Sequence, residues 1–232
     1  SEDGGKINLQ LIGPDNVTYK YFIEEAGCPT VFPFTAGSGS YTVMAFQNIS
    51  GDQYASLFSQ VIDVELKNDF LPFLYPNQYV DFTADSQAVA LAARLTDGLT
   101  SDVDALTAIY EYVTANITYD NEKAATVSGN YLPDIDETLS TGKGICFDYA
   151  SLTAAMLRSV GIPAKLAIGY TASVRHAWID VYIQSVGWVE RAVEFNGDEW
   201  KLMDPTFAAA ETDQELQEYI GDGDNYITEY IR

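Results

Sequence analysis

The residue whose type and surroundings best suit catalysis is Cys146. It lies in the run Thr141 to Ala150, TGKGICFDYA, after two glycines that would let a substrate carbonyl approach the backbone. From Cys146 onward, small and apolar residues recur at three- and four-residue steps, which predicts a helix with one buried face. Gly161 and Pro163 predict its end. The thiol should therefore lie in the first turn, where free amides and the helix dipole favour a thiolate.

A second interpretation of Cys146 is purely structural. A free cysteine is among the most often buried residue types and usually packs as a small hydrophobe, so the local run leaves both interpretations open. The chain has two cysteines, Cys28 and Cys146, and a disulfide between them would exclude a nucleophile. A zinc site is not expected, because two distant cysteines and one histidine give no paired ligand spacing.

Two further residues could support a thiolate nucleophile, which needs an imidazole to take its proton and a group to orient the imidazole. The single histidine of the chain, His176, begins a predicted strand. Asp204 ends a later strand, and Pro205 would hold it extended. A lone histidine on a strand is more often structural, and an isolated Asp-Pro pair is usually a turn. Only the combination with Cys146 indicates a triad.

Three ordered motifs resemble the core of the transglutaminase-like superfamily. They are the cysteine run with its helix and the following GIPA, then HAW at 176–178, then WKLMDPT at 200–206, and the resemblance covers roughly residues 85–210. It implies a papain-like fold in which Cys146 is the nucleophile. It also implies that His176 is the general base and then the general acid, and that Asp204 is the orienting carboxylate.

The resemblance also implies an oxyanion hole. The backbone amide of Cys146 is one donor, and the family commonly adds an upstream side chain, for which Tyr119 is the candidate, with Asn116 behind it. Packing alone could explain Tyr119 equally well. Trp178 is expected to form a wall of the cleft. The chain shows neither an acidic loop of calcium-site spacing nor the paired cysteines of zinc-bearing relatives, so we expect no metal and no cofactor.

The elements that must position these residues predict an α+β fold in two domains. Residues 1–80 predict a small all-β, sandwich-like domain, and residues 81–232 predict the transglutaminase-like catalytic domain, with helices packed on an antiparallel sheet. Strands are expected at 7–11, 17–22, 41–46, 54–58, 61–66, 164–170, 176–184, 188–195, 200–203 and 226–231, and helices at 86–96, 101–115, from 146 and at 214–219. Residues 116–120 lead into a loop that extends to Thr141.

Composition narrows the class of partner. In 232 residues, 34 acids against 12 bases give a formal charge of -22, which would repel nucleic acid and an anionic bilayer. We therefore expect no nucleic-acid binding, and no apolar stretch predicts membrane insertion. The acidic balance, the few lysines and a start at Ser1 without methionine favour a secreted or cell-surface bacterial protein whose signal segment was removed. The oligomeric state stays open.

The expected function is acyl transfer on amide bonds of a protein or peptide through a thioester. Water as the second nucleophile would make the enzyme a protease or deamidase, which we favour. An amine would instead make it a protein-crosslinking transglutaminase. An alternative of another class is a catalytically silent surface module for binding or scaffolding, a role that the N-terminal β domain would suit.

Overall fold

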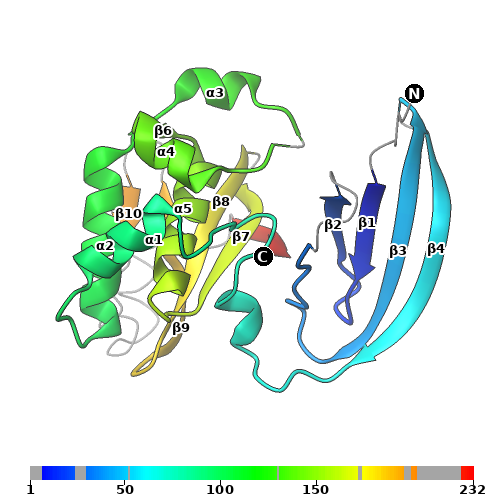
Figure 1. The fold of residues 1–232 in the computed structure, drawn as a ribbon, viewed down its shortest axis with the longest axis horizontal. Helices are drawn as coiled ribbons and strands as arrows, with labels where there is room; N and C mark the ends of the chain where they lie inside the picture. The colour runs from blue at the N-terminus through cyan, green and yellow to red at the C-terminus, as the bar shows by residue number, and fades with distance from the viewer. Residues whose placement is uncertain are drawn as a thin grey trace. The chain divides into compact units, whose positions relative to one another are not determined.

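The chain folds into two compact units, Ser1–Pro72 and Phe73–Arg232, in a computed structural model. The structure describes residues 7–23, 30–51, 53–129, 131–171, 174–195, 200–202 and 226–232. The predicted α+β class is confirmed, since the first unit carries an antiparallel sheet and the second packs helices against another (Figure 1). The domain limit predicted at residue 80 stays a prediction.

The first unit is a four-stranded antiparallel sheet. Its strands are β1 (Ile7–Ile12), β2 (Thr18–Ile23), β3 (Gly39–Ser50) and β4 (Gln53–Val64), in the order β2-β1-β3-β4. Alternation along the strands gathers six apolar side chains on one buried face: Leu9, Leu11, Tyr19, Tyr21, Tyr41 and Ala45. The strands predicted at 54–58 and 61–66 form one strand, because the residues between them contain no turn former.

The second unit follows a short 3₁₀ helix, η1 (Leu71–Phe73), and contains five described helices. They are α1 (Gln87–Leu95), α2 (Asp102–Asn116), α3 (Asn121–Thr126), α4 (Ile135–Thr141) and α5 (Cys146–Ser159). The predictions for α1, α2 and α5 are confirmed. Within the described ranges, no helix has the length and apolarity needed to cross a membrane.

Helices α3 and α4 lie where the sequence predicts only a loop. Each is a short helix with an aspartate at its N-cap, and the side chains of Asp120 and Asp134 accept hydrogen bonds from backbone N–H groups of the first turn. Caps of this kind satisfy donors that a short helix otherwise leaves unpaired. Periodicity cannot reveal helices of six or seven residues, which is why they were missed.

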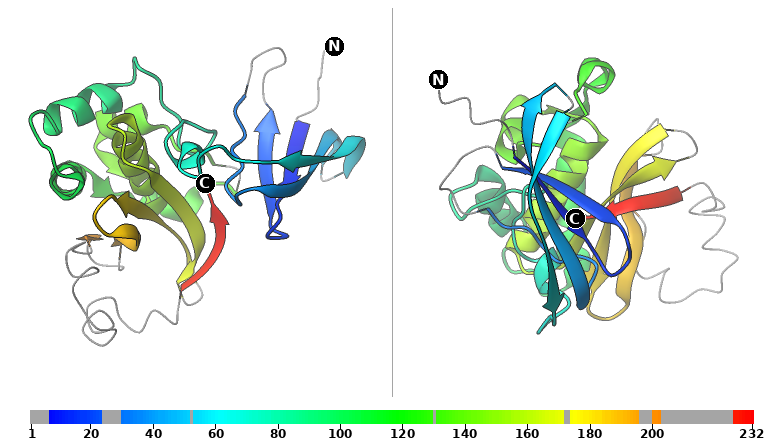
Figure 2. Two further views of the ribbon diagram at one scale, coloured as in Figure 1. Left: turned by 90° about the horizontal axis from the view of Figure 1, so that it is seen from below. Right: turned by 90° about the vertical axis from the view of Figure 1, so that its right-hand side faces the viewer.

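The helices pack on a five-stranded antiparallel sheet of order β10-β9-β8-β7-β11. Figure 2 shows β11 lying beside β7, although the two strands are far apart in sequence. The predicted strands are confirmed as β7 (Ala164–Thr171), β8 (Val174–Ile183), β9 (Gly187–Phe195), β10 (Trp200–Leu202) and β11 (Tyr226–Ile231). The helix predicted at 214–219 lies outside the described residues.

Strand β8 faces two environments. Its residues Ala177, Ile179, Val181 and Ile183 join the buried core under α5. Because side chains alternate along a strand, His176, Trp178 and Asp180 lie on the opposite face, where they too are buried.

The C-terminal end of α5 is tied to the sheet by Arg158, whose guanidinium is almost completely buried. It donates to the backbone carbonyls of Ala164 at 2.9 Å, Tyr75 at 3.0 Å and Arg232 at 2.8 Å. Burial lowers the pKa of Arg158 to about 9. Three carbonyl acceptors compensate this buried cation and fix α5 against β7 and the end of β11.

Replacing Gly169 should detach β11. A Cβ on Gly169 would come within 1.9 Å of the carbonyl oxygen of Ile227, a backbone atom that cannot rotate away. We expect Gly169→Ala to lower the free energy of unfolding by about 2 kcal/mol or more, measured by urea denaturation. Gly129→Ala is the matched control, because a Cβ there meets nothing within 4 Å. Equal stability of both variants would contradict the close packing of β11 on β7.

Candidate active site

Cys146 is the first residue of α5, as the sequence predicts, and Ile145 is the N-cap. Its thiol is free and only partly exposed, so no disulfide engages it. Cys28 lies outside the described residues. Ile145 has no polar side chain to cap the helix, but its own backbone N–H donates to the carboxylate of Asp148 at 2.8 Å. The start of the helix is therefore fixed from within its first turn.

The sulfur of Cys146 lies against the N-terminal part of β8. The described pairing of β8 with β9 begins at Ile179↔Val193. Two residues before Ile179, the backbone N–H of Ala177 donates a hydrogen bond to the sulfur. The cysteine thus contacts a strand amide in the part of β8 that precedes the ladder with β9. This contact brings the sulfur to within one residue of His176 along the strand.

His176 is buried, with 8% of its surface exposed. Its Nε2 atom is buried and has no hydrogen-bond partner among the described residues. Burial lowers the pKa of His176 to about 4, because a charged imidazole loses its hydration there. The ring stacks on Trp178, with centroids 6.1 Å apart and planes at 27°. Trp178 is 2% exposed, so it packs beside the imidazole from the same face of β8.

Tyr119 is brought beside the cysteine run by two short parallel strands. Strand β5 (Thr118–Tyr119) pairs with β6 (Lys143–Gly144), and Tyr119 stands opposite Gly144. Burial raises the pKa of Tyr119, and the neighbouring charges of Cys146 and Asp148 raise it further. Tyr119 therefore belongs to the electrostatic surroundings of the sulfur.

Asn116 was expected behind Tyr119, and its role towards that residue stays a prediction. Its side-chain amide donates to the carbonyl of Tyr112 at 2.8 Å, within its own helix. It serves the C-terminal end of α2. Asp204 lies outside the described residues, so its place relative to His176 stays a prediction.

The two glycines before the cysteine serve the backbone and the packing. Gly142 ends α4 in the left-handed conformation, with φ 62°. A Cβ on Gly144 would come within 2.7 Å of the Cβ of Asp148, so that space is filled by α5 itself. The idea that both glycines clear a path for substrate is therefore wrong for Gly144.

The ionisation of Cys146 differs from the expectation of a ready thiolate. Burial raises the pKa of the thiol above its usual value, whereas hydrogen bonds from the amides of Ala177 and Phe147 lower it. The charge of Asp148 raises it again. Desolvation outweighs the helix N-terminus, because the charged form loses more hydration than the amides return. With the pKa of His176 lowered as well, the resting pair is a neutral thiol and a neutral imidazole.

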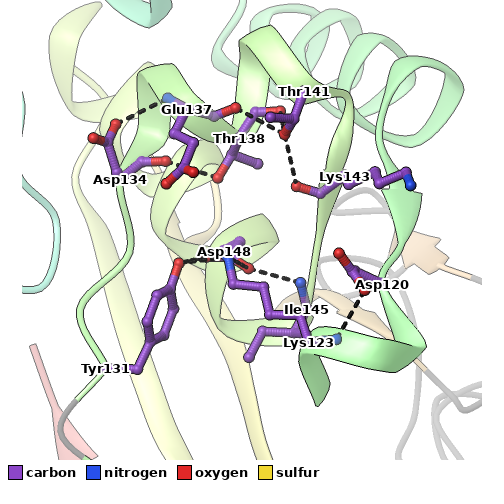
Figure 3. A network of polar contacts seen from close by, with 10 residues as sticks. All are labelled: Asp120, Lys123, Tyr131, Asp134, Glu137, Thr138, Thr141, Lys143, Ile145 and Asp148. Carbon is purple, nitrogen blue, oxygen red and sulfur yellow. Dashed lines mark hydrogen bonds and ion pairs between the residues drawn. The ribbon is translucent and has the colours of Figure 1, made fainter. Parts of the chain in front are cut away.

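Sequence reasoning missed a polar network next to the cysteine. Lys123, Tyr131 and the backbone of Ile145 converge on the fully buried carboxylate of Asp148 (Figure 3). Asp148 stands three residues after the N-cap, where an acidic side chain signals a capping box. This position in the sequence could have predicted the hydrogen bond from the backbone N–H of Ile145 to Asp148. No sequence signal links it to Lys123 or Tyr131. No group of three or more metal-ligating side chains was found in the described part of the chain.

The stability of the protein should fall at acid pH through His176. Its folded pKa is about 4 against an ordinary 6.5, so the contribution is present above about pH 6.5 and is lost as the pH falls towards 4. Between about pH 7 and pH 4, the free energy of unfolding should fall further in the parent than in His176→Gln. We expect this difference to reach up to about 3 kcal/mol. Urea denaturation at each pH measures this.

The comparison with His176→Gln cancels the opposite pH dependence that Asp180 contributes to the stability. Burial raises the pKa of Asp180 to about 6, which contributes stability at low pH that is lost as the pH rises. This carboxyl is present in both proteins and cancels in the difference. Parallel stability curves for parent and variant would contradict a neutral buried imidazole.

Part of the chain is similar to a known family. Residues 89–191, which include Tyr119, Cys146, His176 and Trp178, match the model of the Transglutaminase-like superfamily. The protein YebA of Bacillus subtilis is 23% identical over 68% of this chain. The chain spans about a quarter of the length of that relative, 24%.

Two solved structures are similar at a coarse level. A candidate cysteine protease of Cytophaga hutchinsonii is 21% identical, with a TM-score of 0.45 over 72% of this chain and 48% of its own. The transglutaminase of red sea bream is 13% identical, with a TM-score of 0.35 over 86% of this chain and 45% of its own. Scores of this size carry no conclusion about activity. The family match and the ordered cysteine and histidine motifs agree: residues 89–191 are similar to the core of the transglutaminase-like superfamily.

Proposed function

We propose that the protein is a cysteine-dependent acyl-transfer enzyme that cleaves amide bonds of proteins or peptides, with Cys146 as nucleophile and His176 as acid and base. One observation carries the proposal. The sulfur at the N-terminus of α5 accepts a hydrogen bond from the amide of Ala177, the residue next to the buried histidine. This contact supports the proposal, because a nucleophile on α5 and a base on β8 need to lie near each other for the thiol proton to pass between them.

In the first step, the sulfur attacks the carbonyl carbon of a substrate amide while the thiol proton passes to the imidazole of His176. The imidazolium then gives this proton to the departing nitrogen as the carbon–nitrogen bond breaks, which leaves a thioester and a free amine. Because both groups are neutral at rest, the proton moves as the substrate reacts. A base of low pKa suits this order of events poorly unless a carboxylate supports the imidazolium.

Such support would act at Nε2 of His176, which has no hydrogen-bond partner among the residues that the structure describes. A buried ring nitrogen without a partner is costly, and a carboxylate that accepts a hydrogen bond from it would stabilise the imidazolium that forms during the reaction. Asp204 follows β10, which pairs with β9, the neighbour of β8. We propose Asp204 as that carboxylate, completing the predicted triad.

In the second step, water resolves the thioester. His176 takes a proton from water, the hydroxide adds to the carbonyl carbon, and the carbon–sulfur bond breaks as the imidazolium returns that proton to the sulfur, which gives a carboxylic acid and the free thiol. An amine in place of water would give a crosslinked product. The protein or peptide substrate and export from a bacterial cell remain part of the proposal.

A catalytically silent module is the second candidate, favoured by one observation. The buried neutral forms of Cys146 and His176 are also what an inert core pair would show. Product analysis separates the candidates. The protein is incubated with a mixture of unstructured peptides, with and without a fluorescent primary amine, and the products are analysed by mass spectrometry.

We expect cleaved or deamidated peptides from the parent and none from Cys146→Ala or His176→Ala. Cys28→Ser is the control for the other thiol and should retain activity. Incorporation of the amine would favour the crosslinking transglutaminase. No product under any condition would favour the silent module and contradict the proposal.

Tyr119 is proposed as an oxyanion donor. Its removal should slow the chemical step, because the developing negative charge would lose one hydrogen bond. We expect Tyr119→Phe to lower kcat by about a hundredfold with little change in KM. Tyr112→Phe, on α2, is the matched control. A Tyr119→Phe variant as active as the parent would leave Tyr119 with a packing role only.

A further inference from the structure

We propose that Lys123 is a positioning residue for the nucleophile: acting through Asp148, it holds a buried carboxylate in an ion pair and shields the sulfur of Cys146 from that negative charge. The inference rests on the proposed role of Cys146 and deepens it. It gives a function to a cluster that the triad itself does not use.

Asp148 is a buried carboxylate next to the cysteine. Its side chain is completely buried, and it lies in the same helical turn as Cys146. A buried carboxylate persists only if it is paired and hydrogen-bonded. Here Oδ1 accepts from the hydroxyl of Tyr131 at 2.5 Å, and Oδ2 accepts from the backbone of Ile145 at 2.8 Å. Lys123 supplies the positive charge, with Nζ 2.8 Å from Oδ2.

The position of Lys123 is fixed both by its backbone and by its side-chain ammonium. Its backbone N–H donates to the side chain of Asp120 at 2.9 Å, and the backbone N–H of Asp120 donates to the carbonyl of Gly144 at 2.9 Å. Its ammonium also donates to the hydroxyl of Tyr131 at 2.6 Å and lies 4.4 Å from the centroid of that ring. Lys123 thus links α3 to Asp148, and Asp120 links it to Gly144, so the two contacts lie on either side of Cys146 in the sequence. Figure 3 shows Lys123 beside Asp120, Tyr131 and Asp148.

Titratable groups from three elements surround the sulfur of Cys146. Among the described residues, the titratable groups recorded near it are Asp148 on α5 and Tyr119 on β5, and His176 on β8 lies next to the amide that contacts it. Asp148 opposes formation of the thiolate. The ammonium of Lys123, in contact with the carboxylate of Asp148, weakens this opposition. At the distance of the sulfur, the positive and negative charges of the pair largely cancel. Without Lys123, the full charge of Asp148 would act on the sulfur.

The test measures the thiol itself and needs no substrate. The rate of alkylation of Cys146 by iodoacetamide is followed across pH in a Cys28→Ser background. Lys123→Met should shift the titration of the thiol to higher pH by about one unit, which means about tenfold slower alkylation below the pKa. Lys123→Arg keeps the charge and should restore the parent profile. Lys143→Met, which removes an exposed lysine of β6, should leave the profile unchanged.

Two further variants keep the inference falsifiable if Lys123→Met does not fold. Asp148→Asn removes the negative charge and should shift the titration to lower pH, and in Lys123→Met/Asp148→Asn the upward shift should disappear. Identical profiles for the parent and a folded Lys123→Met, or for the parent and Asp148→Asn, would overturn the inference. Since alkylation does not require acyl transfer, a failure here is distinct from a failure of the proposed function, which product analysis reports.

Discussion

The candidate site depends on one junction, where the N-terminus of α5 meets the first part of β8. The amide of Ala177 precedes the ladder with β9 and donates to the sulfur of Cys146. This bond satisfies a strand donor and holds the thiol of Cys146 beside the strand that carries His176. Near the other end of α5, Arg158 donates hydrogen bonds to carbonyls of Ala164 and Arg232, so both ends of the helix are attached to the sheet.

Buried ionisable groups in this unit are stabilised in different ways. Arg158 keeps its charge among three backbone carbonyls, and Asp148 is paired with Lys123 and accepts two further hydrogen bonds. His176 instead is held neutral, because burial lowers its pKa and no described partner supports the charged form. The proposed role of His176 as acid and base requires a group that can change its protonation state. In the described part of the chain, the charges of Arg158 and Asp148 are compensated, whereas no partner stabilises a charged His176.

The sequence predicted most of the elements that position the site. The start of α5 and strand β11 were found at the expected residues, because a long apolar helix pattern and a short alternating strand leave clear signals. Helices α3 and α4 were missed, since their caps rather than any periodicity define them. The ion pair of Lys123 and Asp148 could not be predicted, because no sequence pattern connects a lysine in a predicted loop with an aspartate in a later helix.

The prediction of a ready thiolate failed for a physical reason. Helix N-termini favour thiolates when the sulfur is solvated, and position in the sequence does not reveal burial. The structure adds the desolvation that raises the pKa of Cys146. Catalysis at such a sulfur depends on proton transfer during the reaction, and so on groups that tune its surroundings.

The most direct test of the central claim is to trap the acyl-enzyme. A reaction with a cleaved peptide is quenched in acid during turnover, and the protein is digested and analysed by mass spectrometry. The account predicts an acyl group in thioester linkage on the peptide that contains Cys146, with none on the peptide that contains Cys28. Turnover with no adduct on Cys146, or an adduct on another residue that disappears on chase, would contradict it.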